Sequence, residues 1–368
     1  MAFKCERWTL ANVLPVAFVV WIIGTIWTLY SWLHLLPLLQ LGKTALELDE
    51  DVFHRGAVEA GVSQTLTALL LVCFLRAVCT DPGSVPSTLE WAAEQKAPKL
   101  KWSFHAPSAA GEETERLLPQ PARCQELKQT GERRFCKWCD SYKPDRCHHC
   151  RVCKSCILRM DHHCPWIANC VGFRNHKFFF LLVFYALIDL IFIIVTMSES
   201  LWKALSEETP PMHRFLLVFC MTLAVIMGFL LTMFFGLHVW LMLVATTTIE
   251  FCEKRHRYGS HSGAGAAPSY DRGLYDNIRA VLGPVPFFWL LPMMPPVGDG
   301  LSFALQDKAG KGSAECTEAD LGQSRGPEDT ANQPEKEATA RLALTPQTDT
   351  PPLDLSPPEV TGAKAAAV

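Results

Sequence analysis

Charge is scarce in this sequence. Of its 368 residues, 19% are Asp, Glu, Lys or Arg, 49% are hydrophobic, and the formal net charge is −3. A mean hydropathy of +0.13 over this length argues against an ordinary soluble protein. The near-neutral balance provides no global basic field, so no nucleic-acid partner is expected. The 11 Trp and 21 Phe exclude a mainly disordered chain.

Charges are scarcest in four long segments, two of which contain none, while residues 60–79 hold only Arg76 and residues 178–197 only Asp189. Residues 13–39 contain no charged side chain over 27 residues, which exceeds the roughly 20 residues that a helix needs to cross a bilayer. The segment is too long for the apolar core of a signal peptide. We therefore expect an α-helical polytopic membrane protein with four transmembrane helices, and the fourth, free of charge over 35 residues, should project beyond the bilayer. The expected helices cover residues 13–39, 60–79, 178–197 and 215–249.

The loops between these helices differ in charge. Residues 133–177 hold ten Lys or Arg against three Asp, whereas the two short connections, 40–55 and 198–214, are acidic on balance. The positive-inside rule then places residues 133–177 and both termini in the cytosol. We expect 84–131 to be a cytosolic linker. Beyond the fourth helix we expect an amphipathic and apolar element at 270–296 and a disordered tail at 304–368.

Eight of the 15 cysteines fall between Cys136 and Cys170. Repeated Cys-x2-Cys pairs with neighbouring histidines have the spacing of zinc ligands, and the cytosol would keep these thiols reduced. An iron–sulfur cluster is the alternative, but clusters prefer all-cysteine ligation. Spacing alone does not pair the ligands, and two closed zinc sites would use eight of the twelve cysteines and histidines present.

One part of this region suggests reactivity. In Asp161-His162-His163-Cys164 a thiol stands next to imidazoles and a carboxylate, which is how proteins generate a reactive thiolate. A purely structural zinc module explains the Cys-x2-Cys pairs but fits this tetrad poorly.

The stretch from Cys136 to Phe178, CKWCDSYKPDRCHHCRVCKSCILRMDHHCPWIANCVGFRNHKF, resembles the DHHC-type protein S-acyltransferases, or palmitoyltransferases. Three flanking motifs agree with this resemblance: one like DPG, one like TTxE, and one like the family's C-terminal NxxxVFG element. Taken alone, the first could be a turn after a helix and the second a helix cap. The motif residues are Asp81, Pro82 and Gly83, then Thr247, Thr248 and Glu250, and finally Asn277.

The resemblance implies two structural Zn²⁺ ions and a catalytic triad. Cys164 would be the nucleophile, His162 its base and Asp161 the orienting acid. One zinc would be held by Cys136, Cys139, His149 and Cys156, and the other by Cys150, Cys153, His163 and Cys170. Cys147 then remains as a further candidate ligand or a free thiol.

The implied reaction transfers a fatty acyl group from acyl-CoA, such as palmitoyl-CoA, to cysteines of membrane-associated proteins through a Cys164 acyl-enzyme. The acyl chain would lie among the helices, with Trp166 and Phe179 near the mouth of its cavity. Asp189 departs from the neutral residues usual in the family, and a hydrogen bond to a neighbouring helix would also explain it. Arg174 and Lys177 could contact the CoA phosphates or anchor the protein at the membrane surface.

Other functions fit the sequence less well. A zinc-stabilised adaptor would not need the intact triad, and a metal transporter would need more ionisable residues inside the helices. The family suggests the Golgi or the endoplasmic reticulum as the membrane, with the plasma membrane as an alternative.

Overall fold

The computed structural model describes residues 9–44, 46–92, 124–128, 130–258, 269–294, 296 and 298–304, without the side chains of 254–258. Most of the expected linker at 84–131 lies outside the described residues. All of the expected tail at 304–368 except Ala304 also lies outside the described residues.

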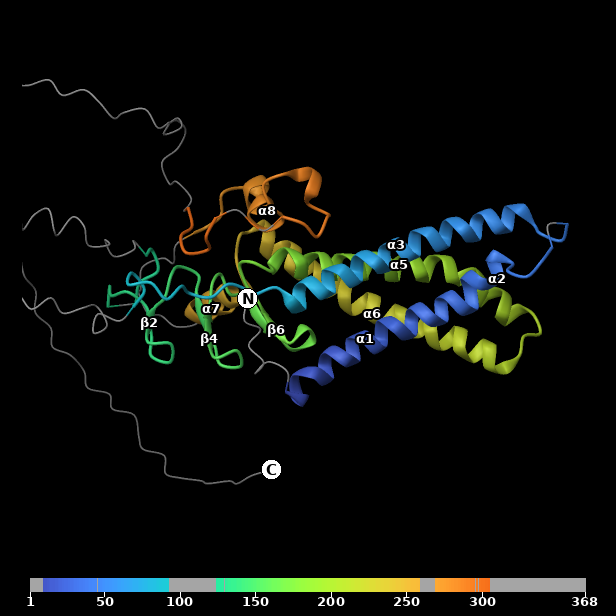
Figure 1. The fold of residues 1–368 in the computed structure, drawn as a ribbon, viewed down its shortest axis with the longest axis horizontal. Coiled ribbons are helices and arrows are strands. Elements are labelled where there is room, and N and C mark those ends of the chain that lie inside the picture. The colour runs from blue at the N-terminus through green and yellow to red at the C-terminus, as the bar shows by residue number, and fades with distance from the viewer. Residues whose placement is uncertain are drawn as a thin grey trace, which may run out of the picture. The chain divides into compact units, whose positions relative to one another are not determined.

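Four long helices run side by side (Figure 1) and are long and apolar enough to cross a membrane. The cysteine-rich region lies between the second and the third of them, as predicted. The first helix continues through a π-helical segment, η2, into a last turn, α2. The bounds are α1 Leu10–Tyr30, η2 Ser31–Leu35, α2 Leu36–Leu39, α3 Glu50–Cys79, α5 His176–Ser206 and α6 Pro211–Leu243.

The second and third long helices extend beyond the expected spans. α3 begins ten residues before residue 60, because Asp49 caps its first turn by accepting the N–H of Val52 at 3.2 Å. The acidic residues Glu50 and Asp51 in that first turn also favour a helix N-terminus. α5 covers residues 176–206 rather than 178–197.

The fourth helix does not continue to residue 249 as expected. α6 ends at Leu243, and Ala245 adopts a left-handed conformation with φ of 49°. A separate helix, α7, then covers Thr248–Tyr258. The chain therefore changes direction at 244–247, which brings α7 to the cysteine-rich region (Figure 1).

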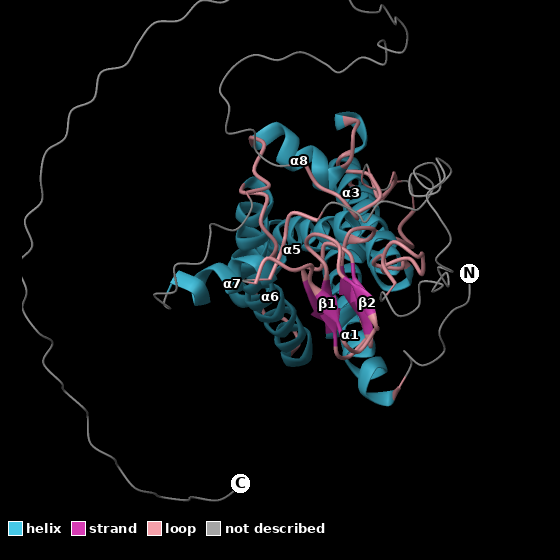
Figure 2. Cartoon of the chain, turned by 90° about the vertical axis from the view of Figure 1, so that its left-hand side faces the viewer, coloured by secondary structure: helices cyan, strands magenta, loops and turns pink. Residues whose placement is uncertain are grey.

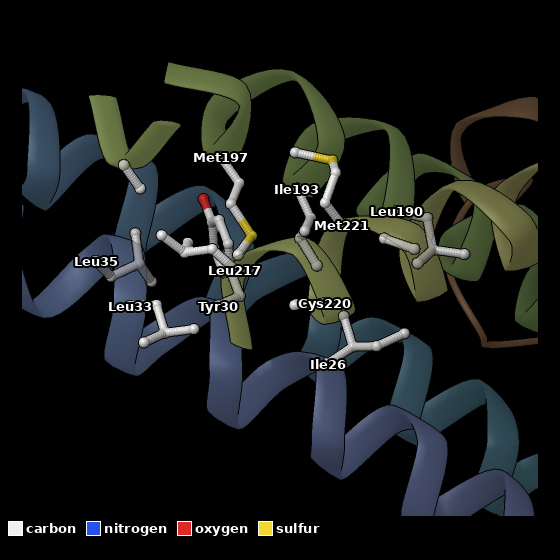
Figure 3. Packing of buried hydrophobic residues seen from close by; sticks show 12 residues of the cluster. Ile26, Tyr30, Leu33, Leu35, Leu190, Ile193, Met197, Leu217, Cys220 and Met221 are labelled. Carbon is white, nitrogen blue, oxygen red and sulfur yellow. The ribbon is translucent and has the colours of Figure 1, made fainter. Parts of the chain in front are cut away.

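The helices are held together by apolar packing and a few internal hydrogen bonds. Figure 3 shows the largest cluster, to which α1, α5 and α6 contribute residues such as Ile26, Ile193 and Leu217. Within it the Tyr30 hydroxyl is hydrogen-bonded to Thr196 Oγ1 at 2.8 Å. This cluster lies toward the end of the helices that is far from the cysteine-rich region.

The cysteine-rich region consists of three short β-hairpins (Figure 2 shows the first). In the second hairpin His149 is the register partner of Cys156, and in the third His163 is the partner of Cys170. A short 3-10 helix, η4, follows Cys164. The bounds are β1 Phe135–Cys136, β2 Ser141–Tyr142, β3 His148–Cys150, β4 Ser155–Ile157, β5 His162–Cys164, η4 Pro165–Ile167 and β6 Asn169–Val171.

The C-terminal element, expected at 270–296, folds as helix α8, Leu274–Leu282, and the short turn η5, Pro286–Phe288. It packs on the helices where they meet the hairpins. Lys177 fixes it there, because its ammonium donates to the carbonyls of Phe288 and Met293, both at 2.7 Å.

Candidate active site and metal centres

Strand geometry explains why neighbouring residues of this region serve different sites. Successive side chains of a strand point to opposite faces. In β3, His149 therefore faces one cluster of thiols and Cys150 faces another. In β5, His163 points to the second cluster, whereas His162 and Cys164 share the other face, toward the helices.

The first predicted ligand set comes together in space. The ligand atoms of Cys136, Cys139, His149 and Cys156 all lie within 4.8 Å of one another. The three sulfur atoms are 3.5, 3.2 and 3.9 Å from His149 Nδ1. Tetrahedral zinc with Zn–S of about 2.3 Å and Zn–N of about 2.0–2.1 Å requires a sulfur–nitrogen separation of about 3.5 Å. The four residues fit a closed zinc site.

The second set has the same arrangement. The sulfur atoms of Cys150, Cys153 and Cys170 lie 3.7, 3.5 and 3.6 Å from His163 Nδ1. Cys153 and Cys170 sulfurs are 3.4 Å apart, near the roughly 3.8 Å expected for two thiolates on one tetrahedral zinc. Cys147, which the ligand sets leave over, is fully buried against the first cluster beside Cys136 and Cys156.

Asp161, His162 and Cys164 form a connected chain of side chains. His162 Nδ1 donates to Asp161 Oδ2 at 2.7 Å, and Cys164, two residues along β5 on the same face, lies close enough to the imidazole to raise its pKa. Thr248, the first residue of α7, donates its backbone N–H to Asp161 Oδ1 at 2.9 Å and its hydroxyl to Oδ2 at 2.8 Å. These three bonds fix the carboxylate, which in turn fixes the orientation of the imidazole.

The hydrogen bonds also determine the charges in this chain. Burial alone would raise the pKa of the Asp161 carboxyl, but the bonds from His162 and Thr248 outweigh burial and hold its pKa below the ordinary value. Burial likewise opposes protonation of His162, yet the bonds to Asp161 and Cys164 raise the pKa of this imidazole to about 9. The arrangement stabilises an imidazolium between a carboxylate and a sulfur atom, as a thiol base requires.

The motif of Thr247, Thr248 and Glu250 both caps a helix and serves the site. Thr247 and Glu250 form a capping box: Thr247 N–H donates to Glu250 Oε2 at 3.0 Å, and Thr247 Oγ1 accepts the N–H of Glu250 at 3.3 Å. Glu250 also pairs with Arg146 through two bonds of 2.6 and 2.9 Å. Burial would raise the pKa of Glu250, but the Arg146 guanidinium lowers it. The pair joins α7 to the hairpin region and so places Thr248 beside Asp161.

The motif of Asp81, Pro82 and Gly83 also joins a helix to the hairpin region. Asp81 Oδ1 accepts the N–H of Gly83 at 2.8 Å, which closes a turn in which Gly83 has φ of +97°. The carbonyl of Gly83 then accepts the N–H of Leu158 at 3.0 Å, and the carbonyl of Pro82 that of Arg174 at 3.1 Å. These bonds fix the end of α3 against the hairpins.

Asn277 secures the end of α6. Its side-chain amide donates to the carbonyl of Leu243 and to Asp271 Oδ1, both at 2.7 Å. Because the last carbonyls of a helix have no partner within the helix, this bond stabilises the point where the chain turns toward α7.

A cavity of about 490 Å³ extends from Cys164 between the helices, and its walls are almost entirely apolar. Trp166, half-exposed, and Phe179, buried, line it near Cys164. The Phe179 ring lies 5.1 Å from that of His162. Asp189 lines the same cavity farther along α5, so all three residues expected to contact an acyl chain are on its wall.

The two residues expected to meet CoA differ from each other. Arg174 is exposed and lines a second cleft together with Arg76. Lys177 is only 1% exposed, and its ammonium is occupied by two carbonyls of the C-terminal segment. In this structure Lys177 therefore fixes that segment and does not face solvent, whereas a side chain that binds a phosphate would.

Sequence reasoning missed His238. This buried residue of α6 lies with its ring centre 5.8 Å from that of His162 and 5.4 Å from that of Phe179. A histidine in an otherwise apolar helix was a signal that could have drawn attention to it. Arg146 was also missed in its role as the partner of Glu250.

The fold and site define a zinc-binding, cysteine-centred module on a four-helix membrane bundle. Residues 129–255 match the family model described as DHHC palmitoyltransferase. Palmitoyltransferase ZDHHC15A of Danio rerio is 34% identical over 238 residues, which cover 63% of this chain and 69% of the relative. The chain belongs to the DHHC palmitoyltransferase family.

Human relatives match over a shorter part. Palmitoyltransferase ZDHHC2 of Homo sapiens is 39% identical over 176 residues, 47% of either chain. Palmitoyltransferase ZDHHC15 of Homo sapiens is 37% identical over 179 residues, which are 48% of this chain and 52% of the relative. The matched region thus spans about half the length of these two relatives.

Proposed function

We propose that the protein is a palmitoyltransferase that transfers a long-chain acyl group from acyl-CoA to cysteine thiols of membrane-associated proteins. The observation that carries the proposal is the connected chain Asp161–His162–Cys164 at the mouth of an apolar cavity. Acyl transfer needs a thiolate and a base beside it, and a fatty chain needs an apolar site. Membership of the family supports both the thiolate chemistry and the apolar site for the acyl chain.

In the first step His162 takes the proton of the Cys164 thiol, and the thiolate attacks the thioester carbonyl of the acyl-CoA. The bond from the carbonyl carbon to the CoA sulfur breaks, and the CoA thiolate takes the proton from His162. The acyl group is then a thioester of Cys164, with its chain in the cavity lined by Phe179.

In the second step a cysteine thiol of the acceptor protein gives its proton to His162 and attacks the Cys164 thioester. The thiolate of Cys164 leaves and regains the proton from His162. One thioester is exchanged for another, so the overall reaction needs little driving force, and ping-pong kinetics follow. Asp161 keeps the imidazole oriented through both steps because Thr248 fixes it in turn.

The two Cys3His sets would hold two Zn²⁺ ions with structural roles, since each supplies four protein ligands and leaves no open position. Metal binding would fix the three hairpins, whose strands have only two or three residues each.

The positively charged loop of residues 133–177 supports a cytosolic position for the hairpin region and both termini. Cytosolic acyl-CoA and cytosolic cysteines of other membrane proteins would then reach the site from the same side. The Golgi or the endoplasmic reticulum is the proposed membrane, with the plasma membrane as the alternative.

The test uses protein purified in detergent, labelled palmitoyl-CoA, and the wild type beside Cys164→Ser. The wild type should acquire a label that hydroxylamine removes, as it removes thioesters, and Cys164→Ser should acquire none. Zinc analysis of both proteins, expected at two ions per chain, shows that the variant is folded. A variant labelled at the wild-type level would refute the role of Cys164.

A further inference from the structure

The apolar cavity has a carboxyl group in its far part. Asp189 is 6% exposed, and its Oδ2 accepts the hydroxyl hydrogen of Thr67 at 2.9 Å. Its other oxygen, Oδ1, is buried and has no hydrogen-bond partner among the residues that the structure describes. Buried polar atoms of proteins are almost always paired, and Asp189 is one of the residues that line the cavity, so its unpaired oxygen indicates a missing partner there.

The cavity wall provides no hydrogen-bond partner for Oδ1 in the described part of the chain. Asp189 and Thr67 are the only described residues lining the cavity whose side chains contain oxygen, and the remaining wall is chiefly aliphatic and aromatic. Ile193 and Ile26 line the cavity and also belong to the packed cluster of Figure 3, so the carboxyl lies next to a well-packed core. One helical turn before Thr67, the hydroxyl of Ser63 is likewise buried without a partner in the described part of the chain.

The position along the helix shows which part of a ligand would meet the carboxyl. Phe179 packs on His162 near Cys164, and Asp189 follows ten residues later on α5. At 1.5 Å per residue this is about 15 Å, or half of the roughly 30 Å hydrocarbon core of a bilayer. Half the core is the depth that one leaflet of lipid chains fills. The end of a long acyl chain attached to Cys164 and running along α5 therefore reaches Asp189.

We infer that this cavity takes long acyl chains that carry a hydroxyl group at or near their far end. The inference rests on the proposed function, and names the class of its acyl substrate. A hydroxyl can both donate and accept, so it pairs with Asp189 Oδ1 whether the carboxyl is protonated or not. A chain that ends in methyl leaves Oδ1 unpaired in an apolar wall, which is unfavourable.

The test is a competition between palmitoyl-CoA and ω-hydroxypalmitoyl-CoA for acylation of Cys164. Intact-mass spectrometry resolves the two acyl-enzymes because the added oxygen changes the mass. In the wild type we expect the hydroxylated chain to be preferred at least about tenfold in initial rate. Asp189→Leu should remove this preference and favour the methyl-ended chain, whereas Asp189→Asn, which still forms hydrogen bonds, should retain most of it.

Ile188→Leu is the matched control, because Ile188 is the preceding residue of α5 and does not line the cavity. It should preserve the wild-type ratio, and zinc content should be two per chain in every variant. A wild-type ratio within about twofold of one, or an unchanged ratio in Asp189→Leu, would overturn the inference while the proposed function stands. If neither acyl-enzyme forms in folded wild type, the proposed function is overturned, and the inference with it.

Discussion

The hydroxyl of Thr248 should increase the rate at which Cys164 is acylated. Thr248→Val removes the bond of 2.8 Å to Asp161 Oδ2, retains the backbone bond to Oδ1, and hardly changes side-chain volume. A hydrogen bond to a charged group contributes about 1.5–3 kcal/mol. If the imidazolium of His162 depends on a fixed carboxylate, the barrier rises by this amount and the rate falls about 10- to 100-fold.

The assay is rapid-quench measurement of acyl-enzyme formation at saturating palmitoyl-CoA. Thr246→Val is the matched control, since the Thr246 hydroxyl donates to the carbonyl of Val244 at 3.1 Å and does not reach Asp161. The control should react at nearly the wild-type rate. If Thr248→Val also reacts within about twofold of wild type, the reasoning that links α7 to the catalytic carboxylate is refuted.

Two further predictions concern stability. Glu250→Gln leaves the buried guanidinium of Arg146 without its countercharge, so the free energy of unfolding should fall by about 3–5 kcal/mol. Glu132→Gln, which affects an exposed pair with Lys128, should leave the thermal midpoint unchanged, and equal midpoints for both variants would contradict the role of the buried pair. A strong chelator should release two zinc ions per chain. Acylation and the folded structure of the hairpin region should then be lost together. Full acylation after loss of both ions would show that the ions do not maintain the site.

The sequence was most informative where the chemistry is local. Long apolar stretches with at most one charged residue predicted the four apolar helices, and the spacing of Cys and His indicated metal sites near Cys136–Cys170. It did not pair the ligands, because pairing depends on which face of each short strand a residue occupies. The family resemblance provided that assignment, and the structure brings the same eight residues together in two sets.

Contacts between distant residues could not be predicted. Asp189 and its partner Thr67 are 122 positions apart, and Lys177 meets carbonyls more than 110 positions away. The break between α6 and α7 depends on one left-handed residue, Ala245, in a run that hydropathy treats as continuous. His238 of α6 lies beside His162 of β5, a contact between elements that are far apart in the sequence. These features follow from tertiary packing, which overrides local patterns.

A pulse–chase experiment tests the central claim, a covalent acyl-enzyme at Cys164, most directly. Protein labelled with palmitoyl-CoA is freed of unbound label and then mixed with a membrane-anchored peptide that contains one cysteine. We predict that peptide mapping places the label on Cys164 before the chase and that the label moves to the peptide cysteine without added acyl-CoA. Label that resides on another residue, or that stays on Cys164 while the peptide is acylated only in the presence of acyl-CoA, would contradict the account.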